Sequence, residues 1–580
     1  MSTANSTTRP AAVRPLGEPT PHLFKIGLSI LVATIIPYLC GYLLAPSGLT
    51  FQGTLNNIGD LSQYLAAIRQ GSRGALLYTN QFTPDHARRL VMYTPYLLAG
   101  HVALGLSPPA AFQLLRLVCG GAALWAVAVL CKLFLGDHVL RASWLFVLLA
   151  GGLYWLALPL AAILPGGVSP SALTAPEFNP LIALLVSPHE ALGLAAELLG
   201  FACVLRASGA SAPLWTDQRP QRGGGEQWSW TMGAAASFLV LALSYPFLLP
   251  TVGLVLLVYA AVAARGAWHG HVAGATKKRR LRAGDVFVGE IRTIVVALFP
   301  AGLLGLYYVV IFHGDPLWSK SNLAQVTTPD FGVLLFALGP LAVGAYAGAR
   351  RLRAVRAAGG DAVAGAWAWF PLIWASVNAC TLLFPIWQQG RQTLGLSVPL
   401  ALMSFYALAG PRAVAGRQRL YLPPIPACIL VFSAPLLLGL YTAVAASGVN
   451  HDYYTPTGIV RAAQWLGDHA GDDDLVLSSA GFGNLVPEYC SCRVLVGQNF
   501  QSFDRARRIE EAGRFYAAPN PAAALRALHA MAANGDRVTL IVFSPYERDL
   551  GRLAPNPPRG YLTVYHEQGV TIIGRKAAGG

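Results

Sequence analysis

The stretch between Lys25 and Asp60 contains no charged residue. Its first part, residues 26–45, reads IGLSILVATIIPYLCGYLLA, and these 20 residues suit a hydrocarbon core about 30 Å thick. The 25 residues before it are polar and rich in proline, and no convincing small-x-small cleavage motif follows residue 45. We therefore expect a retained transmembrane helix preceded by a disordered cytoplasmic tail at 1–25.

The apolar character extends over the whole 580-residue chain, which is 54% hydrophobic and only 12% charged, with a mean hydropathy of +0.49. Soluble proteins average about 25% charged residues. The chain is therefore predicted to be a polytopic membrane protein, with a transmembrane domain at 26–446. The candidate spans are 26–45, 91–107, 113–135, 142–163, 187–206, 230–246, 248–265, 293–312, 331–347, 367–386, 394–409 and 426–446.

The net charge of +15 comes entirely from the part of the chain before Val449, because the remainder carries 13 basic and 13 acidic residues. The excess basic residues cluster in short loops at 277–282, 350–356 and 412–419. Basic loops of this kind face the cytoplasm, so the charge indicates topology and no nucleic-acid partner is expected. This orientation places the first loop, 46–90, and the tail outside the cytoplasm. It requires an odd number of crossings, about eleven, and 91–107 is the weakest span.

Residues 447–580 are predicted to form a separate extracytoplasmic domain. Helical patterns after Pro456, at 505–517 and at 521–535 alternate with strand patterns at 474–477, 493–500 and 537–545, and a hairpin pattern at 561–575 closes the chain. Such alternation is typical of a small α/β layer. The GFGN segment at 481–484 lacks a dinucleotide fingerprint and is expected to be a turn. The C-x-C pair Cys490 and Cys492 is open to a disulfide or redox role, or to plain packing.

Asp60 is the first charge after the opening span, at the start of the helical pattern DLSQYLAAIRQG. It is either a helix N-cap or a functional carboxylate. The loop that follows is rich in arginine, amide and aromatic side chains, among them Arg69. A long outer loop with a helix, a carboxylate and a basic rim is typical of a site for phosphate or sugar.

Four further residues lie near the predicted outer ends of spans. Glu177 in TAPEFNP is either a second carboxylate over the site or a solvated loop acid. His189 and Glu190 open a helix in SPHEALG, where they either favour the helix N-terminus or contact acceptor or phosphate. Arg391 in GRQ either extends its charge to the interface or holds a lipid phosphate.

Asp60 with its YLAAIRQG helix, SPHE at 187–190, PIWQQGRQTLGLSVPLAL at 385–402 and the tail segments VLSS, LVPEY and SPYER together resemble the C-type (GT-C) polytopic membrane glycosyltransferase superfamily. The likeness is to bacterial members that take a sugar from a polyprenyl-phosphate carrier in the cell envelope. It implies a mainly α fold, a transmembrane helical bundle with a small C-terminal extracytoplasmic α/β domain. The implied reaction is an inverting transfer to an acceptor hydroxyl at the outer face of the membrane.

The resemblance implies Asp60 as the catalytic base. The implied substrate-binding residues are Arg69, Glu177, His189, Glu190 and Arg391. Many members carry paired carboxylates in the first loop, whereas Asp60 stands alone, so no metal ligand is predicted and Mg²⁺ or Mn²⁺ is left open as a cofactor. The implied partners are the lipid-linked donor, a lipid, glycan or protein acceptor, and membrane lipids.

Two other classes of function fit a polytopic chain. A lipid or glycan transporter or flippase should carry charged residues inside its spans, and the sequence shows almost none in mid-span. A non-catalytic membrane scaffold would lack a pocket at the first loop. The glycosyltransferase hypothesis is preferred to both.

Overall fold

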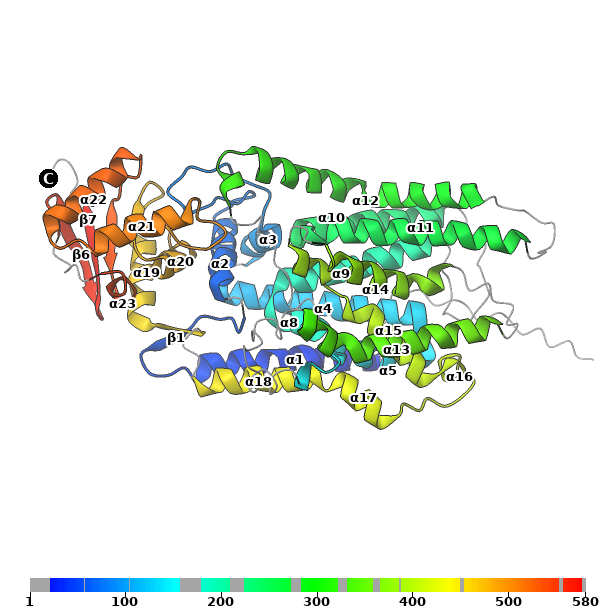
Figure 1. Cartoon of the computed structure of the whole chain (residues 1–580). Helices are drawn as coiled ribbons and strands as arrows, with labels where there is room; N and C mark the ends of the chain where they lie inside the picture. Colours follow the sequence, from blue (N-terminus) through cyan, green and yellow to red (C-terminus); the bar gives the residue numbers. More distant parts are fainter. Residues whose placement is uncertain are drawn as a thin grey trace, which may run out of the picture.

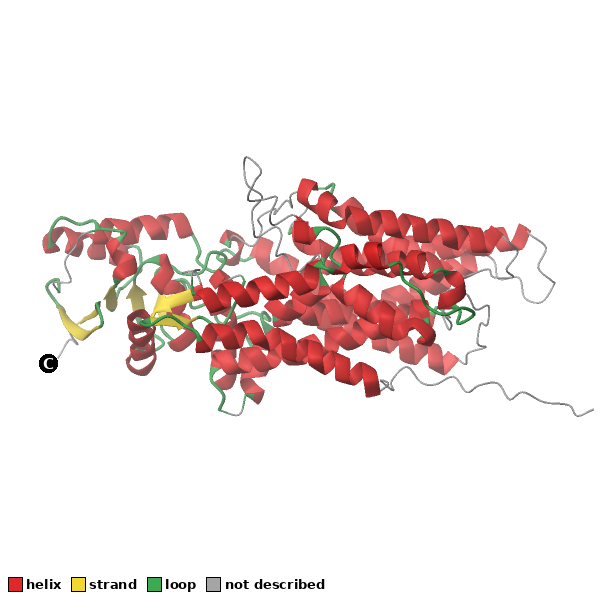
Figure 2. Ribbon diagram, turned by 90° about the horizontal axis from the view of Figure 1, so that it is seen from below, coloured by secondary structure: helices red, strands yellow, loops and turns green. Residues whose placement is uncertain are grey.

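The computed structural model describes residues 21–56, 58–103, 105–156, 179–208, 224–272, 283–321, 331–357, 366–384, 388–448, 453–551 and 557–575. The molecule is elongated, with a helical bundle at one end and a domain that contains a β-sheet at the other (Figures 1 and 2). Glu177 lies outside the described residues.

The long helices of the bundle run roughly along the length of the molecule (Figure 1). Its helices are α1 (Pro21–Leu43), α4 (Pro108–Leu135), α5 (Leu140–Leu149), α8 (Pro180–Val186), α9 (Pro188–Ala207), α10 (Gly224–Ser244), α11 (Leu249–Val272), α12 (Ala283–Gly314), α13 (Phe331–Ala357), α14 (Phe370–Thr381), α15 (Ser397–Ala409), α16 (Pro411–Val414), α17 (Pro424–Val431) and α18 (Ser433–Ser447). Short 3-10 helices are η1 (Asp137–Val139), η3 (Pro246–Leu248), η4 (Trp318–Lys320), η6 (Ala366–Trp369) and η7 (Gln389–Thr393).

Six helical segments among the described residues are long and apolar enough to cross a membrane, and a seventh is reached if α17 and α18, which meet at 41°, form one bent span. Along α12, the side chains of Phe299, Leu303, Leu306 and Val310 are all more than half exposed. An apolar ridge of this length cannot be left in water, so it fits contact with lipid. The polytopic character is supported, and the count of about eleven crossings stays a prediction.

Helices α2 (Ile58–Ser72) and α3 (Thr94–Val102) lie at the end of the bundle nearest the C-terminal domain, and α2 runs across the direction of the long helices (Figure 1). The two helices approach very closely, because a Cβ atom added at Gly100 would lie 2.0 Å from the carbonyl oxygen of Ile68. Helix α3 falls within the weakest predicted span, 91–107, and its nine residues are too short to cross a hydrocarbon core.

The C-terminal domain, residues 453–575 as described, is built on a five-stranded sheet of order β4-β3-β5-β7-β6. β3 pairs in parallel with β4 and β5, and β7 pairs antiparallel with β5 and β6. The strands are β3 (Leu475–Leu477), β4 (Arg493–Val494), β5 (Leu540–Phe543), β6 (Tyr561–Glu567) and β7 (Val570–Arg575). The helices are α19 (Thr457–His469), α20 (Ala480–Tyr489), α21 (Arg505–Tyr516), α22 (Pro521–Ala533) and α23 (Pro545–Arg548). The predicted alternation of helices and strands is confirmed.

The prediction of a turn at 481–484 was wrong, because these residues lie in the first half of α20. The Ser479 side chain caps this helix by accepting a hydrogen bond from the backbone N–H of Phe482. A Cβ atom at Gly483 would lie 2.0 Å from the carbonyl oxygen of Val496. The glycine therefore serves close packing of α20 against the chain after β4, rather than a turn.

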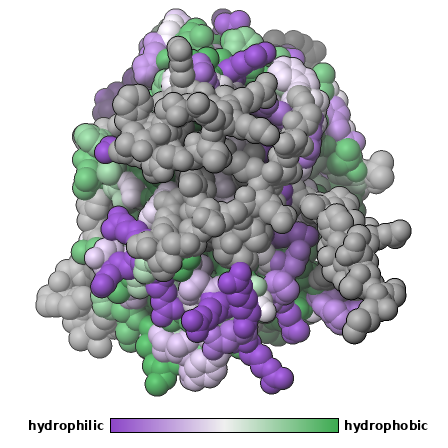
Figure 3. Space-filling model, turned by 90° about the vertical axis from the view of Figure 1, so that its right-hand side faces the viewer, coloured by the Kyte–Doolittle hydropathy of each residue, from purple (hydrophilic) through white to green (hydrophobic). Residues whose placement is uncertain are grey.

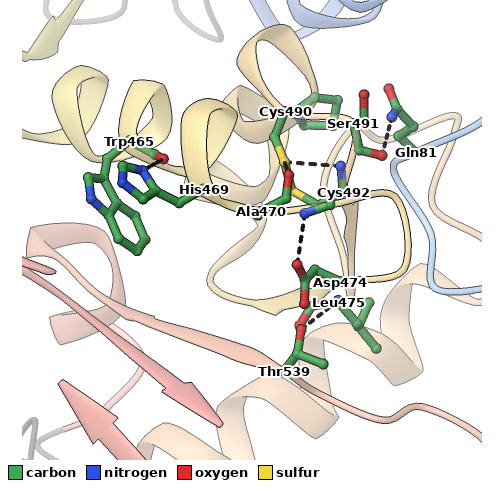
Figure 4. The surroundings of a disulfide bond; sticks show 12 residues. Gln81, Trp465, His469, Ala470, Asp474, Leu475, Cys490, Ser491, Cys492 and Thr539 are labelled. Atoms are coloured by element: carbon green, nitrogen blue, oxygen red, sulfur yellow. Dashed lines mark hydrogen bonds between the residues drawn. A yellow bond between two sulfur atoms is a disulfide. The ribbon is translucent and has the colours of Figure 1, made fainter. Parts of the chain in front are cut away.

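The first loop and the C-terminal domain form one continuous structure. β1 (Leu49–Phe51) pairs antiparallel with β2 (Tyr454–Pro456), and α2 packs against α20. Cys490 and Cys492 are joined by a disulfide at the end of α20, and the intervening Ser491 accepts a hydrogen bond on its carbonyl oxygen from Gln81 of the first loop (Figure 4). The disulfide alternative for the C-x-C pair is therefore the one that the structure adopts.

The opposite end of the bundle is basic. The arginines at 412, 417 and 419 are exposed in and after α16, which lies at the end away from the C-terminal domain (Figure 1). Figure 3 looks onto this end and shows hydrophilic side chains gathered on its lower part. The basic segment at 412–419 and the C-terminal domain thus lie at opposite ends of the bundle.

Candidate functional site

Asp60 is the third residue of α2. It therefore lies inside the helix rather than at its N-cap, and its carboxyl group accepts a hydrogen bond from Nε2 of Gln498 at 2.8 Å. Burial raises the pKa of this carboxyl, whereas the Arg391 guanidinium and the Gln498 hydrogen bond lower it. The group is thus a partly desolvated acid that is held at the junction of the bundle and the C-terminal domain.

Gln498 belongs to the chain after β4, and its amide is fixed in orientation. Its Oε1 accepts from the backbone N–H groups of Phe500 at 2.6 Å and Gln501 at 3.0 Å, so its Nε2 is left to face Asp60. Gln501 in turn donates to the hydroxyl of Tyr93 at 2.8 Å. Gln498 is not predictable as a site residue from the sequence, because it falls within a segment predicted as strand and nothing local connects it to Asp60.

Arg391 lies in η7, which packs against α14 and η3. Its guanidinium lies 5.7 Å from the centre of the Phe247 ring and acts electrostatically on both Asp60 and His189. The preceding residues include Gln388, whose φ of 51° is left-handed. Backbone strain of this kind tends to occur where a side chain must be aimed.

His189 and Glu190 reach the same place from the start of α9, and both are buried. The Tyr96 hydroxyl lies 2.7 Å from Nδ1 of His189, and the Tyr96 ring stacks on Tyr64 with 4.5 Å between centroids. Burial and the negative charge of Asp60 raise the pKa of the Tyr64 hydroxyl. Arg391 acts to lower this pKa, and Glu190 acts to raise it.

Four of the six predicted site residues therefore interact with Tyr64. The His189 ring lies 5.1 Å from the Tyr64 ring, and Asp60, Glu190 and Arg391 act electrostatically on its hydroxyl. They come from α2, the start of α9 and η7, which are far apart in the sequence. Carboxylate, imidazole and guanidinium groups near an aromatic side chain such as Tyr64 can bind a sugar and a phosphate and can transfer a proton.

Arg69 has a different role from the four residues near Tyr64. It is buried on α2 and donates to the carbonyl oxygen of Pro487 at 3.1 Å, to Oγ of Ser491 at 2.9 Å and to Oε1 of Gln81 at 2.8 Å. Each of its three nitrogen atoms thus has a protein acceptor. Arg69 fastens α2 to the C-terminal domain, and we place no substrate contact on it.

The residues at this site do not fit a divalent metal. No three His, Cys, Asp or Glu side chains come together in a metal-binding arrangement within the described part of the chain. The Asp60 carboxyl faces an amide N–H donor and a guanidinium, both of which oppose a bound cation. We therefore route no chemical step through Mg²⁺ or Mn²⁺.

Two charged side chains inside the bundle correct the expectation that its helices carry almost none. Arg116 on α4 is fully buried and donates to Gln113, Thr34 and the carbonyl oxygen of Leu184, so it is a structural residue. Glu197 on α9 is also fully buried. Neither of its carboxyl oxygens has a hydrogen-bond partner among the residues that the structure describes.

No family model matches the sequence, and no curated protein is significantly similar to it. Solved structures of an Archaeoglobus fulgidus oligosaccharyltransferase are similar to the chain in three dimensions. The apo form is 12% identical, with 89% of this chain and 69% of that chain covered and a TM-score of 0.49. The form tethered to an acceptor peptide is 12% identical, with 90% and 69% covered and a TM-score of 0.48. TM-scores this low do not establish a common fold, so the proposal below rests on the geometry of this chain.

Proposed function

We propose that the protein is a membrane glycosyltransferase of the C-type fold. It would move a sugar from a polyprenyl-phosphate donor to an acceptor hydroxyl at the outer face of the cytoplasmic membrane. The observation that carries the proposal is the meeting of Asp60, Gln498 and Arg391 at the junction between the bundle and the C-terminal domain.

The proposed reaction needs one proton transfer and one displacement. The acceptor oxygen attacks C1 of the sugar as the bond between C1 and the phosphate oxygen breaks, and the acceptor proton passes to Asp60. A carboxyl with a raised pKa is a stronger base than an exposed aspartate and suits this role. Attack opposite the leaving group would invert the anomeric carbon.

The leaving polyprenyl phosphate takes the electron pair and needs a cation beside it. Arg391 is assigned this role, because its guanidinium acts electrostatically on the Asp60 carboxyl and lies at the start of the apolar segment Gln389–Ala409. Arginine binds phosphate oxygens through two parallel N–H groups. His189 and Glu190 would contact the sugar, and Glu177 would add a carboxylate from its loop.

The test replaces Asp60 with asparagine in the full chain. Membranes that contain Asp60→Asn are supplied with radiolabelled polyprenyl-phosphate sugar, and label transferred to acceptor is counted. Loss of a general base typically costs about 10²–10⁴-fold, so transfer should fall at least a hundredfold. The matched control is Asp473→Asn, an exposed aspartate of the C-terminal domain, which should transfer at the wild-type rate. Wild-type transfer by Asp60→Asn would remove Asp60 from the reaction.

A further inference from the structure

A cavity of about 440 Å³ lies beside the candidate site, between the first loop and the C-terminal domain. Its walls come from five segments: Gln52 after β1, the start of α2, β2, α20 and α23. Gly59 and Leu61 line it, whereas Asp60 between them points to Gln498 instead. The cavity and the proposed base thus share one helical turn but face different directions.

The cavity has a buried floor and an exposed rim. Tyr454, Ser62 and Glu488 are buried at its floor, and Gly59 and Gly481 are exposed at its edge. Its volume falls in the lower part of the range of small-molecule sites, about 300–1,000 Å³. A ligand in the cavity would enter from the solvent side and remain partly open to solvent.

The lining combines aromatic faces with hydrogen-bonding groups. The cavity is lined by the rings of Tyr454 and Tyr546 and by the amide groups of Gln52 and Asn484. Asn484 donates through Nδ2 to the carbonyl oxygen of Gly59, whereas its Oδ1 is buried and has no partner among the described residues. The cavity thus offers aromatic rings and amide groups to a ligand.

The cavity carries little fixed charge. Glu488 is its one carboxylic acid, and its Oε1 accepts a hydrogen bond from the Ser62 hydroxyl at 2.5 Å. Burial outweighs the lowering effect of the Ser62 hydrogen bond and raises the pKa of Glu488 to about 8. The acid is thus mostly protonated near neutral pH, when it can both donate and accept. Neither a phosphate nor a cation finds a countercharge here.

We propose that this cavity is a subsite for one uncharged sugar unit of the acceptor. The inference rests on the proposed function. A sugar ring has an apolar face for an aromatic side chain and a rim of hydroxyls for amide and carboxyl groups, which matches the lining. The acceptor would then be a glycan or glycolipid whose neighbouring unit sits in the cavity while its reactive hydroxyl faces Asp60.

The test measures binding directly on the purified full chain in detergent. Saturation-transfer NMR is recorded with the methyl glycosides of glucose, galactose, mannose and arabinofuranose. At least one of these probes should give a saturable signal, and its affinity should fall about fivefold or more in Tyr546→Ala and in Asn484→Ala. Tyr421→Ala, at an exposed tyrosine outside the cavity, is the matched control and should bind as wild type does.

The proposal is overturned if no probe binds to the wild-type chain, or if Tyr546→Ala and Asn484→Ala bind the sugar as tightly as Tyr421→Ala does. Tyr546→Phe keeps the ring and should retain most of the affinity, which separates a lost contact from a misfolded protein. Asp60→Asn should bind the probe normally. If sugar binding survives while Asp60→Asn still transfers at full rate, the assigned base fails and the subsite stands. If Asp60→Asn loses transfer and no probe binds, the subsite alone fails.

Discussion

Asp60 is subject to two opposing influences. Burial at the domain junction favours the protonated acid, and the positive charge of Arg391 and the N–H of Gln498 favour the carboxylate. A base must be ionised to accept a proton but gains basicity as its pKa rises. The balance among these three residues therefore decides at which pH the proposed reaction runs.

Replacing Gln498 with leucine should shift the pH dependence of transfer. The rate of a base-catalysed step rises as pH passes the pKa of the base, so the acidic limb reports Asp60. Loss of a hydrogen bond that stabilises the carboxylate raises this pKa further, so the limb should move to higher pH by about one unit. Initial rates measured from pH 4 to pH 9 provide the comparison, with Gln464→Leu at an exposed position as the control. An unmoved limb would contradict the assignment.

Glu197 is a buried carboxylic acid inside the helical bundle, and substitution tests whether the proposed reaction needs it. The buried carboxyl lies beside Trp374 and Gly395, just beyond the segment that carries Arg391. A charge at this depth is costly, so we expect Glu197 to be neutral. The proposed glycosyl transfer does not require it to be ionised. Glu197→Gln should then keep at least half of the wild-type transfer rate, whereas Glu197→Lys should fail to accumulate. Expression and transfer are measured together. A well-expressed Glu197→Gln protein without transfer would show that the carboxyl group itself is required for the reaction.

Among the elements, α2 is the one that joins the two halves of the molecule. It packs against α3 and α4 of the bundle side and against α20 of the C-terminal domain. Gly71 and Gly100 permit the crossing of α2 and α3, because a Cβ atom at either would lie 2.0 Å from a backbone oxygen of the other helix. The position of Asp60 thus depends on glycine at both Gly71 and Gly100, where no side chain keeps the two helices apart.

Gly100→Ala should therefore weaken both the fold and the site. The added methyl group forces the two helices apart, and overpacking of this kind costs about 1–3 kcal/mol. The apparent melting temperature of the detergent-solubilised protein should fall, and transfer should fall with it because Asp60 moves relative to Arg391. Gly513→Ala on α21 meets no atom within 4 Å and serves as the control, with an unchanged or higher melting temperature expected. Equal melting temperatures for the two variants would exclude the packing argument.

For the whole molecule, the arrangement of charge favours one orientation in the membrane. The exposed arginines in and after α16 lie at the end of the bundle away from the C-terminal domain, and basic loops tend to remain in the cytoplasm. The first loop and the C-terminal domain share a strand pair and must lie on the same side. The disulfide in the latter is typical of an oxidising compartment.

Cysteine labelling tests this orientation. In a background without the exposed Cys380 and Cys428, single cysteines are introduced at His86, at Glu510 and at Lys278. A membrane-impermeant maleimide should label the first two in intact spheroplasts, and the third only after permeabilisation. Labelling of Lys278→Cys in intact spheroplasts would show that the orientation is opposite to the one proposed. Labelling of only one of the other two would contradict the shared strand pair.

The sequence by itself determined the features that depend on composition and local periodicity. The absence of charge from Lys25 to Asp60 predicts a helix that avoids water, and the alternation after Pro456 predicts the α/β domain, because both signals repeat over a few residues. The same reasoning failed at GFGN, where glycines suggested a turn and close packing of Gly483 against Val496 decided for a helix.

Only the tertiary structure decided which groups meet. Gln498 lies 438 residues from Asp60, and no local pattern connects the two. Arg69 looked like a phosphate ligand in sequence, yet it binds the C-terminal domain because that domain folds back onto α2. Long-range contacts of this kind depend on the packing of whole elements. The sequence could therefore nominate Asp60 and Arg391, and only the fold could supply Gln498, the partner of Asp60, and the cavity lined by its neighbours Gly59 and Leu61.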